Sequence, residues 1–216
     1  MDDTLKIDEN TFISKFMDDV LMTGEKPVSV YKFTKELETD ESEFHKYFGS
    51  FEHLEKRVFV LFFENSLEML HKNEEYANYD NKNKLLSLYF TMFEMMTANR
   101  SYVTQALSMR KGNLKSMLVL KDLKTAFSKY IETLDIEKID IKSDAINNLQ
   151  DKGQVEIFWL QFLMLLKFWM DDTSKSFEKT DIFIEKSINA SFDLIDTKPL
   201  KSIFDLGKFL FKEKMK

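Results

Sequence analysis

Residues 28–54 read VSVYKFTKELETDESEFHKYFGSFEHL, and this stretch decides the fold. Ser29 can cap a short helix in which apolar residues recur three to four positions apart, the spacing of an amphipathic helix. A tight turn at 38–40 then leads into a second short helix over 41–48, and the Gly-Ser pair at 49–50 ends it. The stretch therefore predicts a helix, a turn and a helix.

Helical periodicity continues on both sides of this stretch. Before it, apolar residues from Phe12 to Leu21 predict a first helix, which Gly24 and Pro27 close. The later helices are predicted over Phe51–Asn73, Leu85–Ala98, Tyr102–Arg110, Leu114–Leu134, Val155–Met170, Phe177–Ile195 and Pro199–Lys214. Residues 171–174 read DDTS, which predicts a helix stop followed by a cap. No segment alternates strictly enough to predict a strand, so the pattern indicates an all-α protein.

The composition restricts the class of protein. With 216 residues, 44% of them hydrophobic and 31% charged, the chain should fold as a globule. It contains no cysteine, which excludes disulfides, thiolate metal sites and cysteine nucleophiles. The start Met1-Asp2-Asp3 lacks the layout of a signal peptide, and the most apolar segment, 155–170, is shorter than the ~20 residues of a membrane span. We therefore expect a cytoplasmic protein without a membrane span.

Acidic side chains are concentrated at the N-terminal end of the chain. Residues 1–60 contain fourteen acidic and eight basic side chains, so the whole formal net charge of −6 lies in this part. The remaining residues carry equal numbers of both signs. The predicted helix-turn-helix therefore lies in the acidic part of the protein.

The stretch 28–54 resembles the DNA-binding signature of the tetracycline-repressor (TetR-like) family. The residues at matching positions are Phe33, Thr34, Leu37, Thr39, Phe44, Tyr47, Phe48, Ser50 and Leu54. The resemblance implies an N-terminal domain of three helices over 1–50, which contains the helix-turn-helix, and a larger helical domain over 51–216. It further implies a one-component transcriptional repressor that binds double-stranded DNA as a homodimer and responds to a small hydrophobic ligand.

On this resemblance, DNA contacts are expected on and before the second helix of the signature. The residues concerned are Lys32, Lys35, Ser42, Glu43, His45, Lys46 and Tyr47. The chain departs from the family in the turn and on the DNA-facing side, where Glu38 and Glu43 stand. DNA carries one negative charge per ~1.7 Å of axis, so these carboxylates oppose binding, although Glu can accept a hydrogen bond from cytosine. The alternative is a TetR-like protein that does not bind DNA and acts as a hydrophobic-ligand binder or protein-interaction module.

Large apolar side chains in the second domain suggest a ligand site. The candidates are Phe90, Phe93, Trp159, Phe162 and Lys167. With 21 Phe and 12 Met, the core has the adaptable side chains that can enclose an apolar ligand, but ordinary core packing explains the same residues, and both interpretations stay open. The helix over 155–170 is apolar nearly all round, so we expect it to be enclosed. We expect Lys167 to face inward and to pair with a ligand carboxylate.

Two apolar stripes near the C-terminal end predict a dimer interface. The stripe residues are Ile184, Ile188, Phe192 and Ile195 on one helix and Ile203 and Leu210 on the last. Their periodicity indicates amphipathic helices. That the partner is a second copy rests on the resemblance and on the frequency of two-fold dimers.

The sequence contains no pattern typical of an enzyme or a metal site. Glu68 and His71 have the Glu-x-x-His spacing of di-iron bundles, but such sites need a second copy and two more carboxylates. A phosphate-binding glycine loop, a serine-hydrolase elbow and a dinucleotide fingerprint are all missing. We therefore expect neither enzymatic activity nor a metal or other cofactor.

Overall fold

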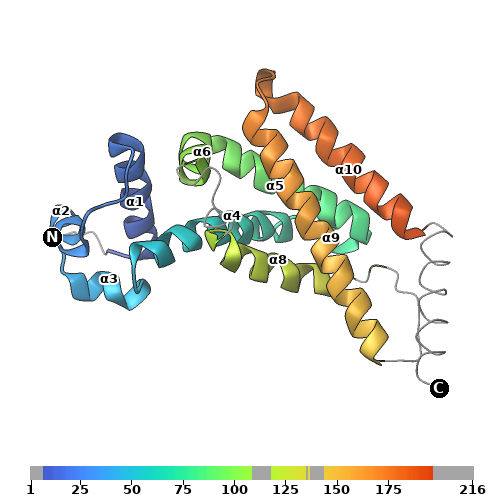
Figure 1. The fold of residues 1–216 in the computed structure, drawn as a ribbon, viewed down its shortest axis with the longest axis horizontal. Coiled ribbons are helices and arrows are strands. Elements are labelled where there is room, and N and C mark those ends of the chain that lie inside the picture. Colours follow the sequence, from blue (N-terminus) through green and yellow to red (C-terminus); the bar gives the residue numbers. More distant parts are fainter. Residues whose placement is uncertain (1–6, 109–117, 135, 137–143, 197–216) are drawn as a thin grey trace. The chain divides into compact units, whose positions relative to one another are not determined.

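The computed structural model describes residues 7–108, 118–134, 136 and 144–196 (Figure 1). The helices are α1 (Glu9–Thr23), α2 (Val30–Glu36), α3 (Glu41–Tyr47), α4 (Phe51–His71), η1 (Glu74–Asn78), α5 (Asn81–Ala98), α6 (Arg100–Ser108), α8 (Lys121–Thr133), α9 (Asp144–Asp171), η2 (Lys175–Phe177) and α10 (Glu178–Asp196). The described residues form no strand, so the predicted all-α class is confirmed. The helix predicted over Pro199–Lys214 lies outside the described residues.

The ends of the first helix follow from its capping residues. Asp8 forms a capping box with Thr11, whose backbone N–H donates to the Asp8 carboxylate at 2.9 Å. At the other end, Gly24 adopts a φ of 79° and donates its N–H to the Val20 carbonyl at 3.0 Å. This left-handed conformation suits glycine, so the predicted stop at Gly24 is confirmed.

The chain divides into two compact units. Unit 1 consists of Met1–Glu68 and Met92–Ala126 and contains α1, α2, α3 and α6. Unit 2 consists of Met69–Thr91 and Phe127–Lys216 and contains η1, α9 and α10. Helices α4, α5 and α8 contribute residues to both units. The functional boundary at residue 50 stays a prediction.

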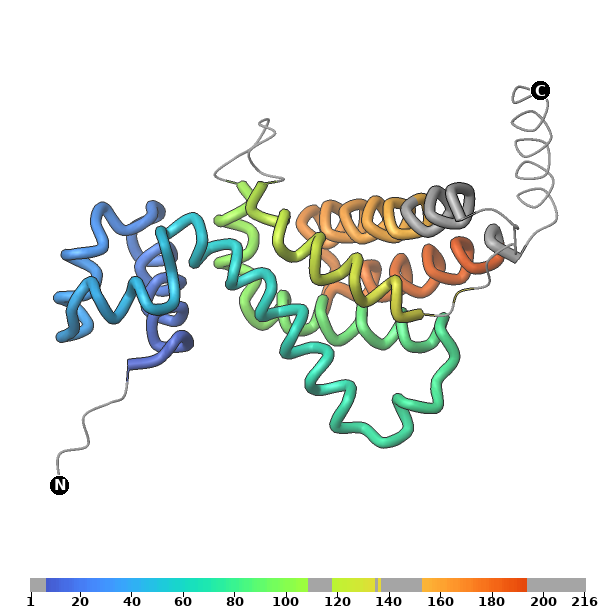
Figure 2. The backbone as a smooth tube through the Cα atoms, turned by 90° about the horizontal axis from the view of Figure 1, so that it is seen from below, coloured from blue at the N-terminus to red at the C-terminus, as the bar shows by residue number. Residues whose placement is uncertain are grey.

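Helices α1, α2 and α3 lie close together in unit 1 (Figure 2), and buried aromatic rings hold them there. The Phe44 ring on α3 lies 5.6 Å from the Phe12 ring on α1 and 6.0 Å from the Phe33 ring on α2. Aromatic pairs of this kind each contribute about 0.5–1.5 kcal/mol beyond the burial of their surface. Phe44 thereby fixes α3 against the other two helices.

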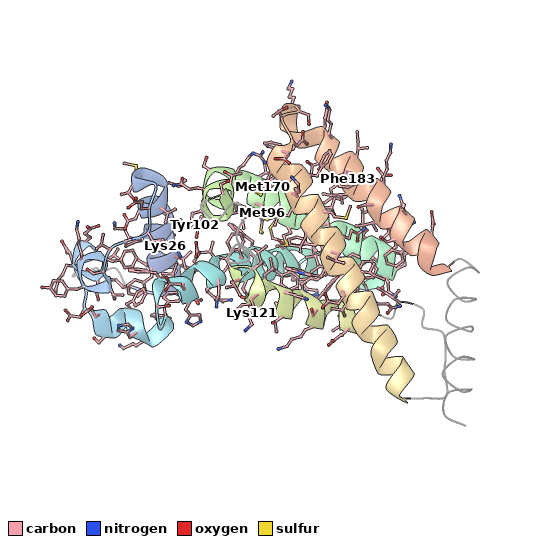
Figure 3. The ribbon with its side chains drawn as sticks, in the orientation of Figure 1. Lys26, Met96, Tyr102, Lys121, Met170 and Phe183 are labelled. Atoms are coloured by element: carbon pink, nitrogen blue, oxygen red, sulfur yellow. The ribbon has the colours of Figure 1, made fainter. Side chains whose placement is uncertain are left out.

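Helix α6 packs against α1 within the same unit. Gln105 Nε2 donates to the Val20 carbonyl at 2.9 Å. The ring of Tyr102, which Figure 3 labels, lies 6.4 Å from the Phe16 ring. The Val20 carbonyl belongs to the last turn of α1 and also accepts from Gly24. The end of α1 is therefore held both by its own cap and by a side chain of α6.

Helices α9 and α10 lie side by side in unit 2 (Figure 1). The Phe158 ring lies 5.8 Å from the Phe192 ring, and Gln161 Nε2 donates to Ser191 Oγ at 3.0 Å. Contrary to the expected start at Val155, α9 begins at Asp144 and runs through Gly153. A glycine inside a helix costs only about 1 kcal/mol relative to alanine, which a long packed helix tolerates.

The turn between α9 and α10 is organised by one carboxylate. Asp172 accepts hydrogen bonds from the backbone N–H groups of Ser174 and Thr180, at 2.8 and 3.0 Å, and from both of their hydroxyls. Burial acts to raise the pKa of Asp172, but these hydrogen bonds outweigh it and lower the pKa to about 2. The predicted stop and cap over 171–174 are confirmed, with Asp172 capping the start of α10.

Candidate functional site

The turn between α2 and α3 contains a residue in the left-handed region. Glu38 has a φ of 54°, and the N–H groups on either side of it, those of Leu37 and Thr39, both donate to the Thr34 carbonyl at 3.0 Å. Ser29 caps α2 as predicted, because its Oγ accepts from the Lys32 N–H at 3.2 Å. The predicted helix, turn and helix are confirmed at these positions.

Helix α3 presents a polar surface opposite its buried Phe44. Ser42 and Lys46 are exposed on that surface, His45 and Tyr47 are exposed at its edges next to the aromatic core, and Glu43 is half-buried. His45 Nδ1 lies 3.1 Å from the Phe48 carbonyl oxygen, which places Phe48 as the acceptor. The structure therefore brings the sequence-predicted residues of α3 together on one helix whose orientation is fixed by its core side.

The lysines of this region form ion pairs with neighbouring carboxylates. Lys46 Nζ lies 2.6 Å from Glu43 Oε1, and Lys35 Nζ lies 2.8 Å from Asp40 Oδ1. The hydrogen bond from Lys35 lowers the pKa of Asp40 and raises that of Lys35. Lys32, the third predicted phosphate contact, is exposed on α2. Part of the positive charge expected to attract DNA is thus balanced by acidic side chains of the same unit.

Two ligand-site candidates lie together in an aromatic cluster of unit 2. The Trp159 and Phe162 rings stack 5.4 Å apart, and the Phe127 ring lies 5.9 and 5.8 Å from them. Tyr89 completes the cluster, 6.1 Å from Phe162, and its hydroxyl donates to the Phe158 carbonyl at 3.1 Å. These side chains are all buried, which fits ordinary core packing as well as one wall of a ligand site.

Phe90 and Phe93 lie on α5, one in each unit. Phe93 is buried, whereas Phe90 is half-buried. Their contact with a ligand stays a prediction.

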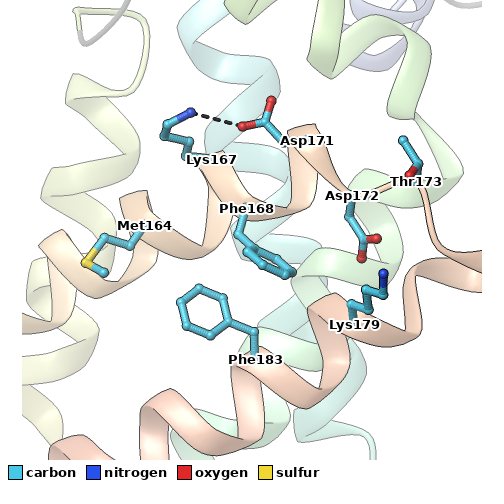
Figure 4. A pocket seen from close by; sticks show the side chains of 8 residues that line it. All are labelled: Met164, Lys167, Phe168, Asp171, Asp172, Thr173, Lys179 and Phe183. Carbon is cyan, nitrogen blue, oxygen red and sulfur yellow. Dashed lines mark hydrogen bonds and ion pairs between the residues drawn. The ribbon is translucent and has the colours of Figure 1, made fainter.

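Lys167 faces solvent, contrary to the expectation that it points inward. Its side chain is 81% exposed, and its Nζ pairs with Asp171 at 3.0 Å (Figure 4). It lies at the rim of a cavity of about 510 Å³ between α9 and α10, beside Met164, Phe168 and Phe183. The physical reason is that burying an ammonium group without a paired carboxylate is costly, whereas at the surface Lys167 pairs with Asp171 and stays in contact with water.

The predicted dimer residues of α10 pack inside the subunit. Ile184 and Ile188 are fully buried, so they do not lie on a surface that a partner can contact. Phe192 is half-buried against Phe158. The side chain of Ile195, and Ile203 and Leu210 entirely, fall outside the described residues.

Helix α9 is not enclosed, and sequence reasoning missed its exposed face. Large apolar side chains there are exposed, among them Ile157, Leu160 and Met164. A signal was present in the sequence, because a helix that is apolar nearly all round has more apolar surface than one contact inside the subunit can cover.

Metal-ligating and membrane-spanning features are not found in the described part of the chain. No group of three or more His, Cys, Asp or Glu side chains there could hold a metal ion. None of the helices within the described ranges is long and apolar enough to cross a membrane.

Comparisons with known proteins agree with the helix order. A model of the family described as "Tetracyclin repressor-like, C-terminal domain" matches residues 84–210, more than half of the chain. No curated protein matches. The fold is similar to the crystal structure of the TetR transcriptional regulator from Nitrosomonas europaea ATCC 19718, with a TM-score of 0.62 and 12% identity over 84% of this chain and 96% of that chain. The chain therefore belongs to the tetracycline-repressor-like family of transcriptional regulators.

Proposed function

We propose that this regulator is a cytoplasmic repressor that binds double-stranded DNA as a homodimer through α3. One observation carries the proposal: Phe44 anchors α3 in the aromatic core, while Ser42 and Lys46 are exposed on the opposite side and His45 and Tyr47 are exposed beside the core. A helix held rigidly with polar side chains outward has the form that enters a major groove. The proposal includes no enzymatic activity and no cofactor.

The regulator responds to a small hydrophobic ligand in this proposal. The support is the cluster of Tyr89, Phe127, Trp159 and Phe162, which supplies a large apolar surface with the Tyr89 hydroxyl as a polar group. Phe90 and Phe93 remain candidates for the same role. A ligand that binds the two states of the dimer with different affinity would shift their populations and so change DNA binding.

Selection of bound fragments from the source genome by the purified protein tests the DNA-binding role. Performed at several salt concentrations, it should recover a preferred sequence, with an affinity that falls as salt rises. Lys46→Glu should abolish the selection because it reverses a charge on the recognition surface. Lys129→Glu makes the same charge change at an exposed position of α8 and should leave the selection intact.

A second function is favoured by the paired lysines. Because Lys46 and Lys35 already neutralise Glu43 and Asp40, the surface of α2 and α3 has little excess positive charge. This supports a TetR-like protein that does not bind DNA and acts as a hydrophobic-ligand binder or a protein-interaction module. Wild-type protein without sequence preference or salt-dependent affinity at low ionic strength would exclude the repressor and leave this second function.

A further inference from the structure

The exposed side of α3 carries a lysine and a glutamate that form an ion pair with each other. Lys46 Nζ lies 2.6 Å from Glu43 Oε1, and the two side chains are 62% and 37% exposed. At 100° per residue, Lys46 lies opposite the buried Phe44, and Glu43 lies about 60° from Lys46 around the helix. Because Phe44 fixes the rotation of α3, the two charged groups are held together on the side that faces away from the core.

Each member of this pair keeps hydrogen-bonding capacity beyond the bond that they share. A carboxylate accepts through both of its oxygens, and an ammonium group has three donors. The shared bond uses Glu43 Oε1 and one proton of Lys46. Glu43 Oε2 and two protons of Lys46 lie outside that bond. The pair can therefore contact a ligand without separating.

A C·G base pair presents the matching groups in the major groove. Cytosine N4 is a donor, and guanine O6 and N7 are acceptors beside it. Cytosine N4 and guanine O6 are hydrogen-bonded to each other, so they lie about 2.9 Å apart. This is close to the 2.6 Å between Glu43 Oε1 and Lys46 Nζ. The acceptor and the donor of the protein pair thus match the donor and the acceptor of the base pair in kind and in spacing.

An A·T base pair suits the two side chains less well. Its donor in the major groove, adenine N6, lies between two acceptors, adenine N7 and thymine O4. A carboxylate that approaches N6 therefore meets an acceptor on each side, whereas cytosine N4 has an acceptor on one side only. Lys46 favours guanine as well, because guanine offers two adjacent acceptors. Both side chains therefore select the C·G pair.

The ion pair also limits attraction to DNA of any sequence. Lysines bind phosphates by neutralising their charge, and Glu43 already neutralises Lys46. Exposed ion pairs contribute little to stability, so a small shift of both side chains onto a base pair costs little. Favourable contacts thus arise at the matching base pair without a large non-specific affinity.

We propose that Glu43 and Lys46 together read one C·G base pair in each half of the DNA site. Glu43 accepts from cytosine N4, and Lys46 donates to guanine. The inference rests on the proposed binding of DNA by α3 and specifies the base pair that α3 selects. It gives a positive role to a carboxylate that otherwise only opposes the binding of phosphates.

Base-pair exchange in a fragment recovered by the genomic selection tests this assignment. Each C·G pair of the half-site is replaced in turn by A·T, which puts adenine N6 in the place of cytosine N4, and affinity is measured by fluorescence anisotropy. For wild type, one exchange in each half-site should lower the affinity about tenfold. Glu43→Gln should remove this preference, because an amide side chain binds adenine through N6 and N7.

The matched control is Glu41→Gln, the same charge change at an exposed position of α3 that lies beside the core rather than opposite it. It should keep the wild-type ranking of the fragments. Lys46→Met should lose the same preference as Glu43→Gln, because guanine is no longer contacted. Lys35→Met should instead weaken all fragments evenly, as the loss of a phosphate contact does.

The outcomes separate this inference from the proposed repressor role. If Glu43→Gln changes the affinity for all fragments evenly and keeps the wild-type ranking, Glu43 acts only through its charge and the inference is wrong, while DNA binding by α3 stands. The same holds if wild type tolerates every exchange of a C·G pair. Wild-type protein without any sequence preference would contradict the repressor role itself.

Discussion

Glu38 occupies a backbone conformation that a glycine adopts at lower cost. Its φ of 54° costs a residue with a Cβ roughly 1 kcal/mol. Glycine removes this conformational cost, but it also increases the entropy of the unfolded chain, which offsets part of the gain. We therefore expect Glu38→Gly to raise the free energy of unfolding by about 0.5 kcal/mol. Urea unfolding followed by circular dichroism measures the change.

The matched control for Glu38→Gly is an exposed glutamate inside a right-handed helix. Glu94→Gly on α5 should lower the free energy of unfolding by about 1 kcal/mol. Equal destabilisation by both substitutions would show that the turn at Glu38 does not adopt the left-handed conformation.

At the scale of the element, the start of α10 depends on the ionised carboxylate of Asp172. The folded-state pKa of about 2 lies below the ordinary value of 3.8, so this stabilisation is fully present above about pH 5 and is lost as the pH falls toward 2. Asp172→Asn should therefore lower the free energy of unfolding by about 1–2 kcal/mol at pH 7. The difference in the free energy of unfolding between wild type and Asp172→Asn should shrink as the pH falls from about 5 toward 2.

Thermal unfolding of both proteins between pH 7 and pH 2 measures this linkage. Asp171→Asn is the control, because that side chain is exposed and its neighbouring carboxylate makes the capping bonds. The lowered pKa of Asp172 would be contradicted if wild type stayed more stable than Asp172→Asn by a constant amount down to pH 2.

For the whole molecule, the proposed repressor role makes non-specific affinity for DNA depend on the balance of charge on unit 1. Glu43→Gln removes one negative charge and releases Lys46 from its ion pair. If α3 binds DNA, affinity at low salt should rise several-fold, and the dependence of log affinity on log salt should steepen by roughly one unit. Glu178→Gln, an exposed substitution on α10, should change neither quantity in the same fluorescence-anisotropy titration. Identical titrations for Glu43→Gln and wild type would contradict the role of α3.

The helix-turn-helix was predictable because its signals are local. The Ser29 cap, the Gly24 stop and the short apolar repeats each act within a few residues. The exposed face of α9 was missed although the helix is apolar nearly all round, because periodicity shows which residues are apolar but not which sides of a helix its own subunit covers. The inward placement of Lys167 was wrong for the same reason, and the predicted helix start at Val155 was wrong because α9 begins at Asp144 and continues through Gly153.

Both tryptophans are buried in unit 2, so tryptophan fluorescence can follow the unfolding of that unit. Trp159 and Trp169 are the chain's two tryptophans, so intrinsic emission reports the loss of unit 2 alone, whereas far-ultraviolet circular dichroism reports the helices of both units. Because α4, α5 and α8 contribute residues to both units, we expect the two signals to follow one transition in urea. A change in dichroism during which tryptophan emission stays constant would instead reveal an intermediate in which unit 1 has unfolded and unit 2 has not.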